Sequence, residues 1–186
     1  MQAIQTVGII GAGTMGNGIA QACATCGINV VMVDISQAAV DKGLATVSSS
    51  LDRLIKKEKI TADDKAAALA GITVATDYAA LAGAQLVIEA ATENEELKIK
   101  ILQQLDAMLP KETLIASNTS SISITKLAAA TQRASQFIGM HFFNPVPMMT
   151  LVEIIRGLQT SDATHEAVKT LAETLGKTPI TVKNAP

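Results

Sequence analysis

Aromatic residues are scarce in this sequence. It contains three Phe, one Tyr and no Trp among 186 residues. Proteins that bind single-stranded nucleic acid usually stack bases on aromatic side chains, so this class of protein is disfavoured. The 15 basic and 17 acidic residues give a formal net charge of -2, which offers no general attraction to DNA or to an anionic membrane. We therefore expect no nucleic-acid partner.

Long apolar runs and a basic N-terminal segment are also missing. Uninterrupted apolar runs such as 30–33 and 86–88 are far shorter than the roughly 20 residues that cross a bilayer. No Lys or Arg precedes Lys42, so the sequence does not start with the positively charged region of a secretory signal. We expect no membrane partner and a cytoplasmic location.

Cysteine is limited to Cys23 and Cys26, which form a CxxC but are too few for a disulfide framework. A reactive CxxC gains thiolate stability at a helix N-terminus. Here the following Gly27 is a typical C-cap, so the pair falls in the last turn of an expected helix. No second Cys pair and no nearby His completes a zinc site. We interpret both residues as small apolar helix residues and predict no metal site.

Hydrophobic residues make up 48% of the chain and charged residues only 17%, which excludes a disordered chain. Short apolar strands alternate with amphipathic helices, and this alternation predicts an α/β fold with a mostly parallel sheet covered on both faces. The expected strands are 4–10, 28–33, 72–75, 85–90, 113–117, 137–141, 151–155 and 179–182. The expected helices are one that ends at Cys26, one that begins after Ser36, and 61–70, 77–81, 95–109, 122–130 and 162–175.

A glycine-rich loop follows the first strand and opens the first helix. Its residues are Gly11, Ala12, Gly13, Thr14, Met15 and Gly16, a GxGxxG in the strand-to-helix context of a Rossmann-type, doubly wound nucleotide-binding fold. The glycines permit a tight turn and a close approach of a pyrophosphate to the helix N-terminus. The alternative is a tight turn with no ligand.

Asp34 ends the second strand, 18 residues after Gly16, at the position that accepts hydrogen bonds from an adenosine ribose. Its negative charge would repel the 2'-phosphate of NADP. The sequence therefore predicts NAD as the cofactor.

Three segments narrow the chemistry: Ser-Asn-Thr-Ser-Ser at 117–121, Gly-Met-His-Phe-Phe-Asn-Pro-Val-Pro at 139–147, and Leu-Val-Glu at 151–153. Together they resemble the L-3-hydroxyacyl-CoA dehydrogenase family, and most of all its bacterial branch that acts on 3-hydroxybutyryl-CoA. The resemblance is collinear from Gly11 to 184–186. It implies NAD-dependent oxidation of (S)-3-hydroxyacyl-CoA to 3-oxoacyl-CoA, or the reverse reduction of acetoacetyl-CoA, in fatty-acid or butanoate metabolism.

By this resemblance His141 is the catalytic base, and Glu153 holds and stabilises its imidazole. The chemistry of the residues agrees, because imidazole titrates near neutral pH and suits proton transfer. Glu153 lies on the next strand after a proline-bearing loop, so the chain can bring the carboxylate back to the ring. The alternative for His141 is a satisfied core histidine. We expect His165, on a polar helix, to be solvated.

Four further residues match site positions of the family. Ser120 matches the serine that hydrogen-bonds the substrate oxygen beside the nicotinamide, and Asn144, Glu93 and Lys98 match cofactor contacts. For Ser120 an alternative remains open, since Ser120 or Ser121 could instead be the N-cap of the helix expected at 122–130.

Coenzyme A carries phosphates and needs cations, and a basic cluster, Arg53, Lys56, Lys57 and Lys59, lies at the end of the long second helix. Ser50 and Lys57 are seven residues apart and share a face of that helix. Both match family positions that contact coenzyme A. Alternatively, the basic residues complement the helix dipole.

The family continues beyond the position of residue 186 into a helical domain that closes over the substrate and forms a homodimer. We therefore expect residues 1–186 to be a single NAD-binding domain. Two other functions stay open: a dehydrogenase of a free hydroxy acid, which would not need the Ser50 and Lys57 face, and a non-catalytic NAD-binding module, which would not need His141 and Glu153.

Overall fold

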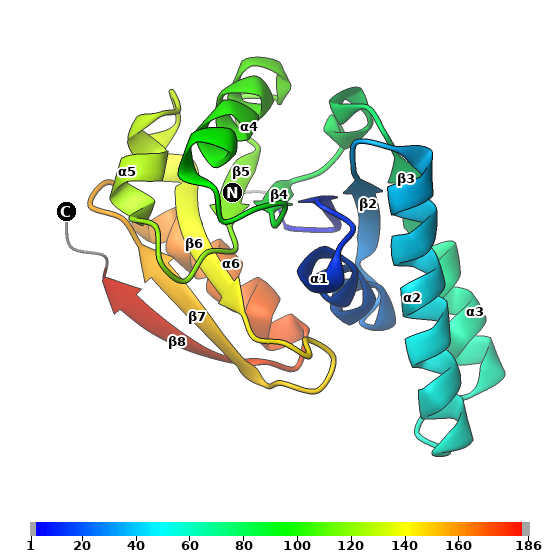
Figure 1. The fold of residues 1–186 in the computed structure, drawn as a ribbon. Coiled ribbons are helices and arrows are strands. Elements are labelled where there is room, and N and C mark those ends of the chain that lie inside the picture. Colours follow the sequence, from blue (N-terminus) through cyan, green and yellow to red (C-terminus); the bar gives the residue numbers. More distant parts are fainter. Residues whose placement is uncertain (1–2, 184–186) are drawn as a thin grey trace.

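Eight strands form one sheet in the computed structural model, which describes residues 3–183 (Figure 1). The strand order is β3-β2-β1-β4-β5-β6-β7-β8. The strands are β1 Thr6–Ile10, β2 Asn29–Val33, β3 Ile72–Ala75, β4 Leu86–Glu89, β5 Leu114–Ser117, β6 Phe137–Phe142, β7 Leu151–Arg156 and β8 Thr178–Lys183. The helices are α1 Thr14–Thr25, α2 Gln37–Lys56, α3 Ala62–Ala70, α4 Glu95–Met108, α5 Ile124–Ala129 and α6 Asp162–Thr174, with short 3-10 turns η1 Tyr78–Leu81 and η2 Ala134–Gln136.

The predicted fold class is confirmed by the pairing of the strands. All neighbours from β3 to β6 are parallel, and so are β7 and β8. Only β6 and β7 are antiparallel, because the short loop between them can make a hairpin but not a parallel crossover. The chain winds outward from β1 to β3 and then returns to place β4 beside β1. The carboxyl ends of β1 and β4 therefore form the switch point where such sheets bind ligands.

Helices cover both faces of the sheet, which explains why the central strands β1, β4 and β5 are buried along almost their whole length. On one face Val7 and Ile9 of β1 belong to a buried cluster that includes residues of α1 and α6. On the other face Ile10 belongs to a cluster with residues of α4 and α5. In Figure 1, α2 and α3 lie beside each other at the β3 edge, and β8 forms the opposite edge.

The CxxC lies where the sequence predicts it. Cys23 is buried on α1, and Cys26 is the exposed C-cap of that helix, followed by Gly27 with a φ of 80°. The pKa of the Cys23 thiol is raised to about 12, chiefly by burial and secondly by the nearby Cys26. Within residues 3–183 no group of three or more His, Cys, Asp or Glu side chains could hold a metal ion.

One of the open alternatives is excluded, and one local expectation is wrong. Helix α5 begins at Ile124, and its N-cap is Ser123, whose hydroxyl accepts from the Lys126 amide at 3.2 Å; the cap is therefore neither Ser120 nor Ser121. His165 is not simply solvated, because its Nε2 lies 2.7 Å from the Thr181 hydroxyl on β8. In the described part of the chain, no helix is both long and apolar enough to span a membrane.

Candidate active site and cofactor cleft

The glycine loop makes a turn that only glycines allow. Gly11 has a φ of 106°, and a Cβ there would lie 2.8 Å from the Ala90 carbonyl oxygen. A Cβ on Gly16 would lie 1.7 Å from the Gly11 carbonyl oxygen. In contrast, a Cβ on Gly13 would meet nothing within 4 Å. Gly11 and Gly16 therefore close the turn, whereas Gly13 leaves open space in front of the N-terminus of α1, where a pyrophosphate can approach.

Asp34 lies directly beside this loop, as the sequence predicts. Its Oδ2 accepts from the Ala12 amide at 2.8 Å, and its Oδ1 accepts from the Ile35 amide at 2.7 Å. These two bonds orient the carboxylate at the end of β2. Asp34 lines two neighbouring hollows and so stands between them.

The two hollows fit the parts of a dinucleotide. The hollow of about 360 Å³ is lined by polar and backbone groups, namely Gly11, Gly13, Thr14, Met15, Asp34, Ala90, Ala91, Thr92, Glu93 and Asn118. The second hollow, of about 550 Å³, has a largely apolar lining, which includes Ile10, Ile35, Tyr78, Ala91, Ile101 and Met108. A pyrophosphate with its riboses suits the first hollow, and an adenine ring suits the second.

The apolar lining of the second hollow is not apparent from motif analysis. Ile35 is 93% exposed, which is unusual for a large aliphatic residue. Its position next to Asp34 is the sequence signal that could have revealed this apolar lining. Tyr78 is partly buried, and this burial, with the charges of Glu89 and Asp34, raises the pKa of its hydroxyl. The Tyr78 ring therefore stays neutral at physiological pH.

Glu93 connects the loop after β4 to the segment that carries Ser120. Its Oε2 accepts from the Thr119 hydroxyl at 2.9 Å and from the Ser121 hydroxyl at 3.2 Å. Ser120, between these two residues, is exposed. The structure thus brings Glu93 and the Ser120 segment together at the carboxyl ends of β4 and β5.

Lys98 differs from its expected position as a cofactor contact. Its side chain is completely buried and forms an ion pair with Glu89, and it also lies 3.3 Å from the Ser117 hydroxyl. It lines neither hollow. Glu89, a residue that the motifs did not indicate, pairs with the ammonium inside the protein, and the expected contact of Lys98 with the cofactor stays a prediction.

His141 and Glu153 face each other across the β6–β7 hairpin. They are paired in register, and His141 Nδ1 lies 3.0 Å from Glu153 Oε1. The ring of Phe143 lies against the imidazole at a centroid distance of 4.4 Å. When Nδ1 donates to the carboxylate, Nε2 is the nitrogen that can accept a proton from a ligand.

The hairpin is attached to the cofactor cleft at several points. Asn118, whose side chain is buried after β5, accepts from the Phe142 amide at 2.8 Å. A Cβ on Gly18 of α1 would lie 2.9 Å from Val146, so the loop after β6 packs directly on that helix. Lys177 donates to the carbonyls of Val146 and Met149, each at 2.7 Å. These contacts hold the His141 hairpin against the helix that follows the glycine loop.

The remaining predicted residues lie outside the two hollows. Asn144 is exposed in the loop after β6. Ser50 is half-buried on α2, and Lys57 is its exposed C-cap. The structure shows these positions but does not test their roles.

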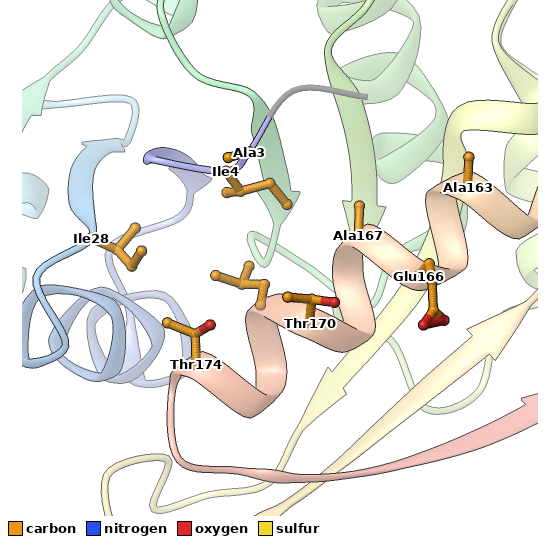
Figure 2. A pocket seen from close by; sticks show the side chains of 9 residues that line it. Ala3, Ile4, Ile28, Ala163, Glu166, Ala167, Thr170 and Thr174 are labelled. Atoms are coloured by element: carbon orange, nitrogen blue, oxygen red, sulfur yellow. The ribbon is translucent and has the colours of Figure 1, made fainter.

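Another hollow, of about 450 Å³, lies beside the starts of β1 and β2 and is lined mainly by small and apolar residues of α6 (Figure 2). Its only ionisable lining residue is Glu166, whose carboxylate is turned away from Ile4 and Ile28 in Figure 2. This hollow does not include the glycine loop, Asp34 or the His141 hairpin, so we do not place the active site there.

A doubly wound sheet with a GxGxxG turn, an acidic residue at the end of β2 and a cleft at the switch point defines a Rossmann-type dinucleotide-binding domain. Comparison with known families agrees with this class. The model of the family described as "3-hydroxyacyl-CoA dehydrogenase, NAD binding domain" matches residues 6–185. The chain belongs to this family, and its cofactor is NAD.

The names of two individual relatives agree with this family. The chain is 51% identical over 174 residues to a 3-hydroxybutyryl-CoA dehydrogenase of Bradyrhizobium diazoefficiens, covering 94% of this chain and 59% of that protein. It is 48% identical to a probable 3-hydroxybutyryl-CoA dehydrogenase of Deinococcus radiodurans, covering 96% of this chain and 64% of that protein. The chain thus spans less than two thirds of these relatives.

A solved structure also agrees with this family. The crystal structure of (S)-3-hydroxybutyryl-CoA dehydrogenase from Ralstonia eutropha superposes with a TM-score of 0.98 and is 70% identical. The match covers 99% of this chain and 65% of that one.

Proposed function

We propose that the protein that carries this domain catalyses the NAD-dependent oxidation of (S)-3-hydroxyacyl-CoA to 3-oxoacyl-CoA, with 3-hydroxybutyryl-CoA as the expected substrate. The reverse reaction reduces acetoacetyl-CoA. The observation that carries the proposal is the hydrogen-bonded His141–Glu153 pair on a hairpin attached to the NAD cleft. Relatives named 3-hydroxybutyryl-CoA dehydrogenase support the substrate class.

In this mechanism His141 Nε2 accepts the proton of the substrate hydroxyl while the carbon–hydrogen bond at C3 breaks. Bound NAD would accept the hydride from that carbon. Glu153 orients the ring through Nδ1 and stabilises the imidazolium that forms. In the reverse direction the imidazolium returns the proton to the oxygen of the keto group. The two steps balance, because one proton and one hydride leave the alcohol.

Other residues orient the reactants in this proposal. Ser120, exposed beside the cleft, hydrogen-bonds the substrate oxygen. Glu93 and Asn144 lie on the cofactor side. Ser50 and Lys57 on α2 bind the phosphates of coenzyme A. By the family resemblance, a helical region beyond these residues would close over the thioester and form a homodimer.

An NADH absorbance assay with acetoacetyl-CoA tests the proposal, on a chain extended through the region that the relatives have in addition. We expect His141→Gln to lower kcat by about 100- to 10,000-fold, the usual contribution of general acid–base catalysis. The Kd for NADH should stay the same, because the glycine loop is untouched. The matched control is His165→Gln, which should keep full activity.

Two outcomes would count against the proposal. A His141→Gln enzyme with most of its turnover would remove the assignment of the base. Equal turnover of free acetoacetate would instead favour a dehydrogenase of free hydroxy acids.

A further inference from the structure

The loop between β6 and β7 joins the two residues of the proposed catalytic pair. It spans 143–150, after His141 on β6 and before Glu153 on β7. The ring of its first residue, Phe143, lies against the His141 imidazole at a centroid distance of 4.4 Å. Its last residue, Thr150, directly precedes β7. The position of this loop therefore affects both His141 and Glu153.

Lys177 holds the loop at two points. Its ammonium donates to the carbonyl oxygen of Val146 and to that of Met149, each at 2.7 Å. Hydrogen bonds from a charged donor are short and stronger than neutral ones. One carbonyl lies three residues after Phe143, and the other lies four residues before Glu153. A single side chain thus fixes both arms of the loop.

The backbone of Lys177 is itself fixed by hydrogen bonds. Lys177 lies shortly after α6 and follows Gly176, which has a φ of 73°. Its amide donates to the Ala172 carbonyl at 3.0 Å. The next residue, Thr178, begins β8, and its amide donates to the Thr150 carbonyl at 2.7 Å. Two consecutive residues between α6 and β8 therefore bind the loop through side chain and main chain.

The loop also packs on α1. Val146 is 2% exposed, and a Cβ on Gly18 would lie 2.9 Å from its side chain. Helix α1 begins in the glycine loop, so this contact connects loop 143–150 to the cofactor cleft. Apolar packing has no directional preference. The two hydrogen bonds of Lys177 therefore supply the directional restraint that such a contact lacks.

Lys177 is not placed like an ordinary surface lysine. An ammonium is strongly hydrated, but this side chain is half-buried, and burial lowers the pKa of the ammonium below its ordinary value of 10.5. The cation gives up part of its water and binds two carbonyls of one loop instead. A role that depends on the position of that loop accounts for this arrangement.

We propose that Lys177 is a positioning residue for the His141–Glu153 pair. It fixes loop 143–150, and through that loop it sets the orientation of the imidazole and of the carboxylate that holds it. Lys177 lines neither hollow of the cleft, so kcat depends on it while the affinity for NADH does not. The inference rests on the proposed function, in which His141 transfers the proton.

The test is steady-state kinetics with NADH and acetoacetyl-CoA, on a chain extended through the region that the relatives have in addition. Lys177→Met keeps most of the length of the side chain but removes both hydrogen bonds. We expect kcat to fall about 10- to 100-fold, because a misplacement of about 1 Å can cost 100-fold. The Kd for NADH, measured by calorimetry, should stay the same. The matched control is Lys111→Met, exposed between α4 and β5, which should keep the wild-type kcat.

Three readouts separate positioning from a loss of folded protein. Dividing the rate by the number of NADH sites that calorimetry counts corrects kcat for any unfolded fraction. Lys177→Arg should recover most of the lost turnover, because a guanidinium can donate to two carbonyls. Since Lys177 acts through His141, the double variant Lys177→Met with His141→Gln should turn over about as fast as His141→Gln alone.

The outcomes distinguish this proposal from the proposed function. A wild-type kcat per NADH site in Lys177→Met would overturn the role of Lys177, and so would a full additional loss in the double variant. If Lys177→Met does not fold, Lys177→Gln, which removes the charge, is measured instead. We expect its kcat to be lowered as well, and a wild-type value would contradict the proposal. Full turnover by His141→Gln would instead remove the proposed function itself.

Discussion

Asp34 has a structural role at the end of β2, and we propose that it also selects the cofactor. Its two oxygens accept from the amides of Ala12 and Ile35, which fixes the carboxylate between the two hollows of the cleft. A carboxylate in this position accepts from ribose hydroxyls and repels a 2'-phosphate. We therefore propose that selection against NADP depends on the charge, whereas the geometry of the loop depends on the oxygens as acceptors.

Replacing Asp34 by Asn separates these two roles, because an amide oxygen can still accept a hydrogen bond while the charge is lost. We expect the ratio of the Kd values for NADPH and NADH to narrow by about tenfold. Fluorescence titration with both cofactors measures this ratio. The control is Asp77→Asn, which alters another acidic residue that lines the second hollow. A native chain that binds NADH and NADPH equally would contradict this interpretation of Asp34.

Cys23 shows how burial controls a thiol. Its pKa is raised to about 12 from an ordinary value of 9.0, chiefly by burial. The unfolded chain therefore loses this proton above about pH 9, while the folded chain keeps it. The contribution of the Cys23 thiol to the free energy of unfolding is fully present below about pH 9. It is lost as the pH rises toward the folded pKa of about 12, at about 1.4 kcal/mol per pH unit.

Urea unfolding between about pH 8 and pH 10.5 checks this effect. We expect the free energy of unfolding of Cys23→Ala to fall less steeply with pH than that of the wild type, by about 1.4 kcal/mol per unit above pH 9. Cys26→Ala, at the exposed cysteine, should keep the wild-type slope. Equal slopes for all three proteins would show that the Cys23 thiol ionises without unfolding.

At the scale of elements, α4 is fixed at both ends. Its N-terminus is held by the Asn94 cap and by Lys98. Its C-terminal end is held by Arg133, whose guanidinium pairs with Asp106 at 2.6 Å and donates to the carbonyls of Asp106, Leu109, Pro110 and Thr113. Through Asp106 and Leu109, this buried side chain satisfies two carbonyls at the end of the helix, where intrahelical partners are missing.

Removing this anchor should destabilise the whole sheet. Arg133→Met leaves the nearly buried Asp106 carboxylate without its cation, and we expect a loss of about 3 to 5 kcal/mol in the free energy of unfolding. Arg156→Met breaks the pair with the fully exposed Asp162 and should cost much less stability, because solvent screens such a pair. Chemical denaturation measures both variants, and a similar small loss for each would refute the role of Arg133.

At the scale of the whole molecule, the proposed cofactor contacts and the proposed catalytic pair lie along one edge of a single sheet. The glycine loop and Asp34 lie at the ends of β1 and β2, and the His141–Glu153 pair lies on the hairpin beyond β5. The residues that we propose to bind NAD, namely the glycine loop, Asp34 and the lining of the two hollows, lie within the described residues.

Residues 1–186 should accordingly bind NADH but turn over acetoacetyl-CoA poorly. At 100 times the Kd, NADH should stabilise the chain by about 2.7 kcal/mol, which a thermal unfolding experiment detects. Turnover should be lower by several orders of magnitude than in a chain extended to the length of the relatives, because orientation of the reactants contributes about 7 to 11 kcal/mol. Comparable turnover by both chains would disprove this.

The sequence by itself determined the class of fold and the cofactor. The order of strands and helices, the glycine turn and the position of Asp34 depend on residues a few positions apart, so local stereochemistry and hydrophobic spacing were sufficient to predict them. The approach of Glu153 to His141 was also predictable, because a short loop between two strands brings their side chains together. The match of the chain to the dehydrogenase family follows from the same continuous segments.

Only the tertiary structure decided the environment of Lys98. Motif analysis assigned it to the cofactor, but it lies inside the core with Glu89 and Ser117, which are 9 and 19 residues away in sequence. For the same reason, the sequence did not reveal the apolar lining around Ile35. Nor did it reveal the hydrogen bond that Asn118 accepts from the Phe142 amide on β6. Burial and pairing depend on which distant residues the fold brings together, and neither periodicity nor a short motif contains that information.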